Sequence, residues 1–342
     1  MASLPRALLL DDPAFSRHVP LGHHPERPER LTAARQAVEK AKKDVTFEAI
    51  VAREATATEL ARVHAPQYVE AMAEHHGASR YLDPDTYVSA ESVAIARRAA
   101  GGVLAMVDAV LEGDVKQGVA LVRPPGHHAR PERAMGFCLF NNVAVAAAHA
   151  RARGLSRVAI VDFDVHHGNG TQEMFYADPS VLYVSTHEAP LYPGTGHVDE
   201  TGEREGKGFT VNVPLSAGGG DDVYRGAFER VVLPVLSEFA PELVIVSAGF
   251  DAAVRDPLSD MRLESEAFGW MTRELRRIAD VSAGGRTLLV LEGGYDLVAL
   301  EGGLVSAIGG LTGSATEIAR DVDHPDVHRA ARAARDAWTS LR

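Results

Sequence analysis

The feature that most constrains the fold is a series of short, almost wholly apolar runs rich in β-branched residues. They lie at residues 118–122, 158–163, 181–185, 209–213, 243–247 and 287–291. Short runs without polar alternation are typical of strands that are covered on both faces, as in parallel sheets. We therefore predict that these runs are buried strands of one sheet.

Longer segments with helical periodicity lie around these runs, at residues 90–111, 141–153, 222–238, 264–279 and 327–341. Asp221 or Asp222, which follows three glycines, is the expected N-cap of the third. Alternation of strand and helix favours parallel strands with crossover helices on both faces. The 342 residues contain no repeat and no low-complexity linker. We therefore predict one catalytic domain over residues 1–342, a three-layer α/β/α structure.

Composition limits the partners. Lysine and arginine number 35 and aspartate and glutamate 47, so the net charge is 35 − 47 = −12. A negative chain does not attract phosphate backbones, so we expect no direct nucleic-acid binding. The one cysteine, Cys138, cannot form an intramolecular disulfide, which fits a reducing cytoplasm. No apolar run reaches the roughly 18 residues that a membrane span needs. We expect a cytoplasmic protein without membrane contact.

Polar residues of unusual type gather directly after the predicted strands, at residues 123–128, 162–167, 185–187, 249–251 and 292–296. In open parallel sheets, ligands bind beyond the carboxyl ends of the strands, all on one edge. This pattern predicts that the functional site is assembled from these five segments.

A metal site is predicted at the second of these segments. Asp162, Asp164 and His166 are spaced by two, so their side chains point to one side of an extended chain. Asp251, after another strand, adds a further carboxylate. Two carboxylates and one imidazole, with a position left for water, are suited to catalytic zinc. Taken alone, an Asp-x-His pattern is equally typical of a capped turn.

An acid–base pair is predicted at His127 and His128, which end a proline-rich bend. One imidazole can take a proton from metal-bound water and the other can tune or deliver it. Asp162 and Asn169 are candidate partners for their second ring nitrogens. Tyr295 lies in a glycine turn, where its hydroxyl could donate to a developing oxyanion; an ordinary turn tyrosine is the alternative.

The chain resembles the histone deacetylase superfamily, within the arginase/deacetylase fold, in segments 24–31, 83–87, 123–129, 136–142, 162–172, 193–196, 247–252, 256–258 and 292–295. It is most similar to bacterial, class II-like histone deacetylase-like amidohydrolases, with acetylpolyamine amidohydrolases as near relatives. The resemblance implies a central, mostly parallel sheet of about eight strands. It also implies a zinc-dependent amidohydrolase that removes an acetyl or other acyl group from an acylated amine such as N-acetyl-lysine.

The resemblance also implies a role for each residue of the site. The zinc ligands would be Asp164, His166 and Asp251. His127 and His128 match the tandem histidines, with His128 as the general base, and Tyr295 matches the tyrosine that polarises the carbonyl. Asp162 matches the partner of the first histidine and Asn169 that of the second, where class I members carry aspartate.

Substrate contacts implied by the resemblance are Asp85, Gly136, Phe137, Tyr192, Leu258 and Gly294. Asp85 would bind the substrate backbone, and Gly136, Phe137 and Tyr192 would wall a narrow tunnel. Leu258 matches a gatekeeper position, where relatives that prefer polyamines can carry an acidic residue. A leucine there favours acyl-lysine or a small acylated amine, with simple rim packing as the alternative.

Structural potassium is also implied. One site would involve Asp162, Asp164, His166, Ser185 and Thr186, partly through backbone carbonyls. A second would involve Phe175, Asp178, Val181 and Phe209. The resemblance leaves the assembly state open between a monomer and a homo-oligomer.

Several alternatives remain open. An arginase-like, two-manganese ureohydrolase would need a further carboxylate two residues after Asp251, but residues 251–254 read Asp-Ala-Ala-Val. An acetylpolyamine or other small-amide amidohydrolase fits the same residues. A binding module without activity should have lost a ligand, a tandem histidine or the tyrosine, and the chain keeps them all.

Overall fold

The structure is a computed structural model, and it describes residues 4–318 and 320–341. Within these residues, eight strands form one sheet in the order β2-β1-β5-β10-β9-β6-β7-β8, and every pairing is parallel. The strands are β1 (Arg6–Leu10), β2 (Thr46–Ala49), β5 (Gln117–Ala120), β6 (Val158–Asp162), β7 (Val181–Glu188), β8 (Thr210–Leu215), β9 (Leu243–Ala248) and β10 (Thr287–Leu291). The predicted α/β class is confirmed, and the sheet is wholly rather than mostly parallel.

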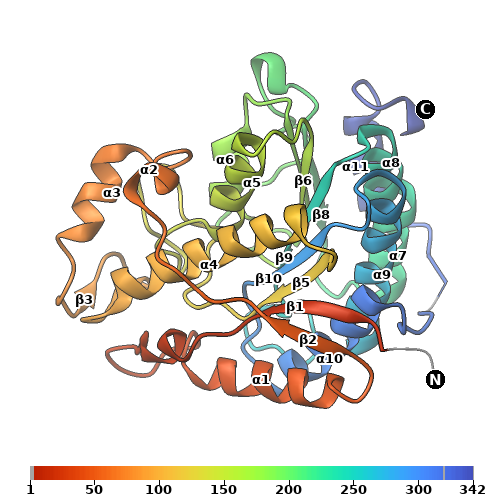
Figure 1. Ribbon diagram of the computed structural model, residues 1–342. Helices are drawn as coiled ribbons and strands as arrows, with labels where there is room; N and C mark the ends of the chain where they lie inside the picture. The colour runs from red at the N-terminus through yellow and green to blue at the C-terminus, as the bar shows by residue number, and fades with distance from the viewer. Residues whose placement is uncertain (1–3, 319, 342) are drawn as a thin grey trace.

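Helices cover both faces of the sheet (Figure 1). They are α1 (Glu29–Ala41), α2 (Ala57–Leu60), α3 (Pro66–Ala73), α4 (Ser92–Glu112), α5 (Asn142–Ala152), α6 (Asn169–Phe175), α7 (Asp221–Ala227), α8 (Leu233–Phe239), α9 (Ser265–Ser282), α10 (Leu297–Thr312) and α11 (Pro325–Ala334). Helices α4 and α5 pack together on one face, and α1, α10 and α9 pack side by side on the other. Near α3, β3 (Arg80–Tyr81) and β4 (Tyr87–Val88) form a small antiparallel pair.

All six predicted strands form; the run at 287–291 has the observed bounds of β10, and the ends of the others shift by no more than three residues. The predicted helix at 222–238 is instead α7 and α8 joined by a π-helical turn, Phe228–Val232. The expected N-cap was wrong. Gly220 precedes α7 without a side-chain cap, and the Asp221 carboxylate accepts from the backbone N–H of Glu264 at 3.0 Å. Strands β1 and β2 and helices α1 and α10 were not among the predicted elements.

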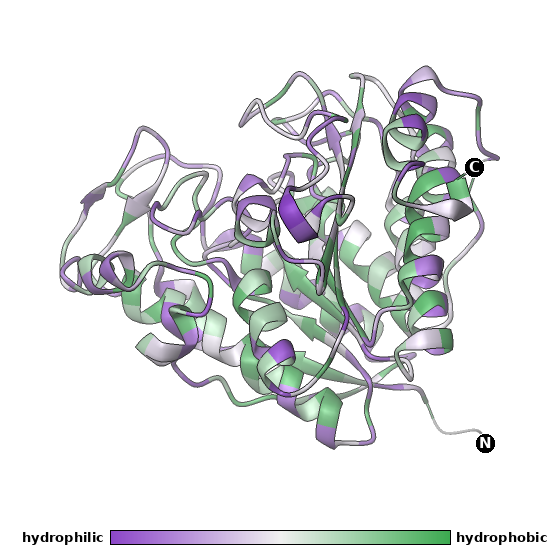
Figure 2. Cartoon of the chain, turned by 90° about the horizontal axis from the view of Figure 1, so that it is seen from above, coloured by the Kyte–Doolittle hydropathy of each residue, from purple (hydrophilic) through white to green (hydrophobic). Residues whose placement is uncertain are grey.

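The core explains why the strands read as unbroken apolar runs. Every residue of β6, β7, β9 and β10 is buried between the two helical layers. Seen from above, these strands are mostly hydrophobic, whereas the helices carry hydrophobic and hydrophilic faces (Figure 2). A second, smaller cluster is formed by side chains of α2, α3, α4 and the loop before α5, and includes Leu60, Met72, Leu104 and Phe140. No helix among the described residues is long and apolar enough to cross a membrane.

Strand register brings the polar strand ends together. Asp162, the last residue of β6, is the register partner of Ser185 on β7 and of Ser247 on β9. Because all strands are parallel, the segments that follow β5, β6, β9 and β10 leave the sheet at this same edge. The site predicted from these segments therefore has one location in the fold.

Candidate active site at the carboxyl ends of the strands

Three side chains at this edge converge as a metal-binding group. Asp164, His166 and Asp251 each offer a ligand atom, and these atoms lie within 4.8 Å of one another. His166 Nδ1 is 3.1 Å from Asp164 Oδ1 and 3.2 Å from Asp251 Oδ2. Both carboxylates are buried. The predicted set is therefore brought together, with one imidazole between two carboxylates.

The electrostatics of this group favour a cation. Burial opposes a charge on His166, but hydrogen bonds to Asp164 and Asp251 prevail and raise its pKa to about 10. Two buried carboxylates whose ligand atoms lie within 4.8 Å of each other need positive charge between them, since burying an unpaired charge is costly. Carboxylate oxygen and imidazole nitrogen are both ligands that zinc accepts. The residues present therefore fit a divalent metal.

His127 and His128 lie next to this group with their rings 4.0 Å apart. His127 Nδ1 is 3.0 Å from Asp162 Oδ2, and His128 Nδ1 is 2.8 Å from Asn169 Oδ1. Both predicted partners are therefore in place. Asp162 is fixed in turn by the hydroxyl of Tyr183, which donates to it at 3.1 Å.

The pKa values of the two histidines shift in opposite directions because their surroundings differ. Burial opposes a charge on His127, yet the carboxylates of Asp162 and Asp164 raise its pKa well above the ordinary value. Burial and the neighbouring His127 lower the pKa of His128 well below the ordinary value. Asn169 is neutral and adds no charge to offset this. The pKa values of the two imidazoles thus shift in opposite directions, and the ring of His128, whose pKa is lowered, is suited to accept a proton.

Tyr295 follows β10, and its loop is held on several sides. The Gly293 N–H donates to Asp164 Oδ2 at 2.8 Å, and the Gly294 carbonyl accepts from Arg30 Nε at 2.7 Å. The Tyr295 N–H donates to Asp256 Oδ2 at 2.6 Å. Burial raises the pKa of the Tyr295 phenol well above its ordinary value, so its hydroxyl remains a hydrogen-bond donor.

A pocket of about 250 Å³ opens onto these groups, lined by Asp85, His128, Gly136, Phe137, His166, Leu191, Tyr192, Leu258 and Tyr295. Five of the six predicted substrate contacts therefore line one cavity. Gly294 is not among the lining residues, and its carbonyl instead binds Arg30. Leu191, which the sequence analysis did not single out, adds to the wall.

The wall at Gly136 and Phe137 has an unusual backbone. Gly136 has φ +55°, and a Cβ there would lie 2.4 Å from His128 Cδ2, so only glycine fits. Phe137 has φ +68° without being glycine. Its N–H donates to Thr86 Oγ1 at 3.1 Å, and the Thr86 hydroxyl donates to Asp85 Oδ1 at 2.9 Å. The wall and the Asp85 carboxylate are thus one connected unit.

The residues predicted for potassium lie in two places. Asp162, Asp164, His166, Ser185 and Thr186 are all buried at the ends of β6 and β7, where the Thr186 hydroxyl has no hydrogen-bond partner among the described residues. Phe175, Asp178, Val181 and Phe209 lie near the start of β7. There the Phe209 carbonyl accepts from Tyr183 N–H at 2.9 Å.

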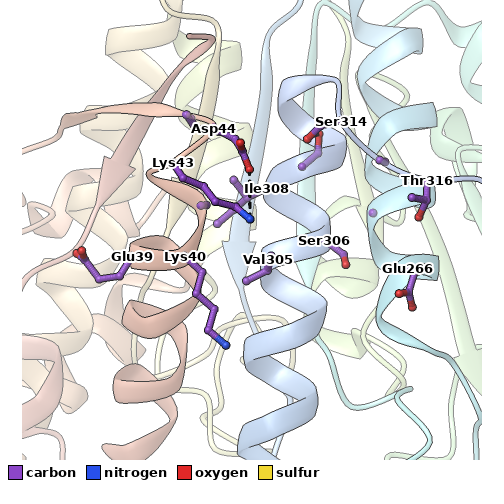
Figure 3. A pocket seen from close by; sticks show the side chains of 15 residues that line it. Glu39, Lys40, Lys43, Asp44, Glu266, Val305, Ser306, Ile308, Ser314 and Thr316 are labelled. Atoms are coloured by element: carbon purple, nitrogen blue, oxygen red, sulfur yellow. Dashed lines mark hydrogen bonds and ion pairs between the residues drawn. The ribbon is translucent and has the colours of Figure 1, made fainter.

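A larger hollow elsewhere on the molecule lacks these groups. It measures about 620 Å³ and lies between the end of α1 and helices α9 and α10. Figure 3 shows Lys40, Lys43, Ser306 and Glu266 along it, with Lys43 beside Asp44. It contains no histidine, and none of the residues predicted for the site. Size therefore does not identify the active site; convergent chemistry does.

A buried ionic network behind the pocket was missed as a functional feature. Arg123 donates to both oxygens of Glu26, at 2.7 Å for Nη2 and Oε2, and Arg30 Nη1 lies 3.3 Å from Glu26 Oε1. All three side chains are fully buried. The segments that contain these residues, 24–31 and 123–129, supported the family resemblance, but the sequence did not indicate a role for the three side chains. The signal available was the density of charged residues in 24–31, which a surface segment would equally explain.

Glu292 was likewise quoted without a role. One of its oxygens accepts the backbone N–H groups of Gly126, at 2.6 Å, and His127, at 3.2 Å. Its other oxygen has no hydrogen-bond partner among the described residues. Glu292 thus anchors the bend that carries the tandem histidines.

Comparison with known proteins agrees with this geometry. Residues 24–311 match the family described as the histone deacetylase domain. The histone deacetylase-like amidohydrolase of Pseudomonas aeruginosa is 42% identical over 299 residues, covering 86% of this chain and 78% of that protein. The human polyamine deacetylase HDAC10 is 45% identical over 295 residues, covering 80% of this chain and 43% of that protein.

A solved structure, described as the crystal structure of the HDA15 HD domain, superposes with a TM-score of 0.91 at 41% identity. The match covers 99% of this chain and 97% of that one. The chain spans about half the length of some curated relatives, such as histone deacetylase 15 of Arabidopsis thaliana, of which it covers 54%. With its matching fold, ordered motifs and converging strand-end residues, the chain belongs to the histone deacetylase family and carries the family's hydrolase domain.

Proposed function

We propose that this chain is a zinc-dependent amidohydrolase that removes an acetyl or other acyl group from an acylated amine such as N-acetyl-lysine. The observation that carries the proposal is that one pocket is lined by His128, His166 and Tyr295 together. Asp164, His166 and Asp251 would hold the zinc, which when bound lowers the pKa of water and polarises a carbonyl oxygen.

His128 acts as the general base. Its Nδ1 faces Asn169 Oδ1 at 2.8 Å, so Nδ1 carries the hydrogen and Nε2 is left as the acceptor. Its lowered pKa keeps it neutral at ordinary pH. His128 therefore takes the proton from the attacking water, while an imidazolium in the pair returns a proton to the leaving amine. Asp162 keeps His127 positively charged beside it.

Tyr295 donates its hydroxyl to the oxyanion that develops on the acyl carbonyl. Since its pKa is raised, the phenol keeps its proton and can donate throughout the working pH range. Arg30 lies against the Tyr295 ring, with 4.9 Å from the guanidinium carbon to the ring centre. The ring is thus held between Arg30 and Phe137, whose ring centre is 5.8 Å away.

The pocket favours an acyl-lysine or a small acylated amine. Phe137, Tyr192 and Leu258 give it mostly apolar walls, which suit an aliphatic chain, and the Asp85 carboxylate at the mouth can accept N–H donors from the substrate. The human relative is a polyamine deacetylase by name, so an acetylpolyamine is the second candidate. Leu258 offers no charge to a second ammonium, which favours the first.

Potassium is proposed to support the site. The buried oxygens of Asp162, Ser185 and Thr186 at the ends of β6 and β7 suit a hard monovalent cation. The second set, near the start of β7, would act through backbone carbonyls.

We further propose that residues 1–342 act as one catalytic unit in the cytoplasm, without direct contact with nucleic acid or membrane. Homo-oligomer formation is open to measurement by light scattering.

Hydrolysis of a fluorogenic acetyl-lysine peptide and of an acetylated polyamine, measured side by side, tests the proposal. We expect zinc-loaded protein to release acetate. Chelation should abolish this activity, and adding zinc back should restore it. His128→Ala and Tyr295→Phe should each lower turnover by about 10²-fold or more while the bound zinc remains one per chain. Normal turnover in zinc-loaded His128→Ala, or release that survives complete metal removal, would overturn the proposal.

A further inference from the structure

We propose that Asp256 is a positioning residue that fixes Tyr295 and the pocket mouth relative to one another by binding backbone N–H groups of both loops. The inference rests on the proposed function of Tyr295 and goes beyond it, since Asp256 itself does not line the pocket.

The contacts of Asp256 carry the proposal. Its Oδ2 accepts from the N–H groups of Tyr295 at 2.6 Å and Asp296 at 3.1 Å. Its Oδ1 accepts from the N–H of Leu258 at 3.1 Å. The residue is only 6% exposed, so water competes little for these bonds. One buried carboxylate thus joins the loop after β10 to the loop after β9.

The place of these bonds along the Tyr295 loop explains why they matter. Upstream, Gly293 is tied to Asp164 and the Gly294 carbonyl to Arg30. Downstream, the Asp296 side chain caps α10 by accepting from Val298 and Ala299 N–H groups. Asp256 binds the main chain between these two anchors, at the residue that carries the phenol. A shift there moves the hydroxyl directly.

The chemistry requires a carboxylate. Its two oxygens accept on two sides, whereas an asparagine offers one oxygen and turns an NH2 group toward the other set of N–H donors. Asp256→Asn therefore keeps the shape of the side chain and breaks one set of bonds. A buried N–H left without its acceptor costs about 1–3 kcal/mol, enough to rearrange a loop.

A positioning role for Asp256 differs from a merely structural one because its effect on kcat depends on Tyr295. If Asp256 acts by placing the hydroxyl, its loss should matter only while that hydroxyl is present. A double-mutant cycle between Asp256→Asn and Tyr295→Phe measures this coupling. A second cycle with Leu258→Ala measures the contribution of the mouth.

The experiment uses the zinc-loaded full chain and an acetyl-lysine peptide. We expect Asp256→Asn to lower kcat by about 10–100-fold, as small misplacements of catalytic groups do, with bound zinc unchanged. In the Tyr295→Phe background the same change should lower kcat less than about threefold. The exposed neighbour Asp260 gives the matched control, and Asp260→Asn should leave kcat unchanged.

Equal fold-losses in the two backgrounds, or loss of zinc from Asp256→Asn, would overturn the proposal. If Asp256→Asn does not fold, Asp256→Glu keeps the charge and displaces both oxygens, and the same cycle applies to it. A Tyr295→Phe variant with normal turnover would instead refute the proposed role of Tyr295, so the two failures can be told apart.

Discussion

The guanidinium carbon of Arg30 lies 4.9 Å from the centre of the Tyr295 ring, although the two residues are far apart in the sequence. The same side chain donates to the carbonyls of Gly294 and Glu292 and pairs with buried Glu26. We expect Arg30→Met to lower turnover at least about tenfold and the free energy of unfolding by about 3–5 kcal/mol, because it leaves two buried carbonyls without donors and leaves Glu26 with Arg123 as its remaining guanidinium partner.

Arg35 is the matched control for this prediction, because it lies on the same helix and pairs with Asp11, with both side chains partly exposed. Arg35→Met should cost no more than about 1 kcal/mol. Denaturant unfolding of both variants gives the comparison. Equal losses of unfolding free energy in the two variants, or unchanged turnover in Arg30→Met, would contradict the prediction.

Changing the partner of His128 should change the pH dependence of the reaction. Asn169→Asp would place a carboxylate 2.8 Å from His128 Nδ1, and a nearby negative charge stabilises the imidazolium. The pKa of His128 rises, so the neutral form that acts as base is present only above a higher pH. We expect the acid limb of kcat/KM to move up by about one pH unit, an effect of about 1.4 kcal/mol.

The pH profile of kcat/KM for wild type, Asn169→Asp and uncharged Asn169→Ser checks this. The serine variant should keep the wild-type acid limb, since it adds no charge. An unchanged limb in Asn169→Asp would mean that another group, and not His128, is the base.

Glu26 should make folding stability sensitive to acid. Burial alone would raise the pKa of Glu26, but the guanidinium of Arg123 beside it prevails and holds that pKa well below its ordinary value of 4.5. A lowered carboxyl pKa adds stability that is present above the unfolded value and is lost as the pH falls below about 4.5. The free energy of unfolding, measured at intervals of roughly one pH unit between about pH 3 and 7, should fall steeply on the acid side.

In Glu26→Gln this acid-side slope should be shallower, and the variant should be less stable at neutral pH by about 3–5 kcal/mol because Arg123 and Arg30 lose their buried counter-charge. Glu59→Gln is the control for the cost at neutral pH, which should be no more than about 1 kcal/mol, since Glu59 pairs with the more exposed Arg53. Identical slopes for wild type and Glu26→Gln would contradict the prediction.

A charge at the pocket mouth should change substrate preference. Leu258 lines the pocket, and Leu258→Glu would place a carboxylate where a second ammonium of a polyamine could approach. We expect the ratio of kcat/KM for acetylpolyamine over acetyl-lysine peptide to rise about tenfold, the equivalent of about 1.4 kcal/mol. Leu258→Gln has the same size without the charge and should change the ratio little. A similar rise in both variants would assign the effect to shape.

The centre of the sheet and the convergence of Asp164 and His166 could be predicted from the sequence because each depends on local pattern. The buried strands β6, β7, β9 and β10 are continuous apolar runs, and the ligand spacing of Asp164 and His166 is set by the chain itself. The edge strand β2 was missed because Thr46–Ala49 is short and mostly exposed, so no apolar run marks it. Periodicity records burial, and this edge strand has little of it, whereas β8 at the opposite edge is almost wholly buried and was predicted.

Helix α10 has many buried residues, and it was missed because of its amino-acid composition. It contains several glycines, which disfavour helices in isolation. The structure shows what they permit: a Cβ on Gly310 would lie 2.1 Å from the Gly269 carbonyl oxygen, so α9 and α10 approach backbone to backbone. The roles of Asp256 and Glu292 escaped sequence reasoning for a related cause. Both bind backbone N–H groups across the fold, and no spacing of side chains encodes such partners.

The left-handed backbone of Phe137 sets a conflict for anyone who wishes to make this enzyme more robust. Such a conformation costs a residue other than glycine about 1–3 kcal/mol. Selection for heat resistance alone would favour Phe137→Gly. That substitution would remove the ring that faces Tyr295. Thermostable variants should therefore be screened for turnover in the same round, because at this position durability and catalysis are selected in opposite directions.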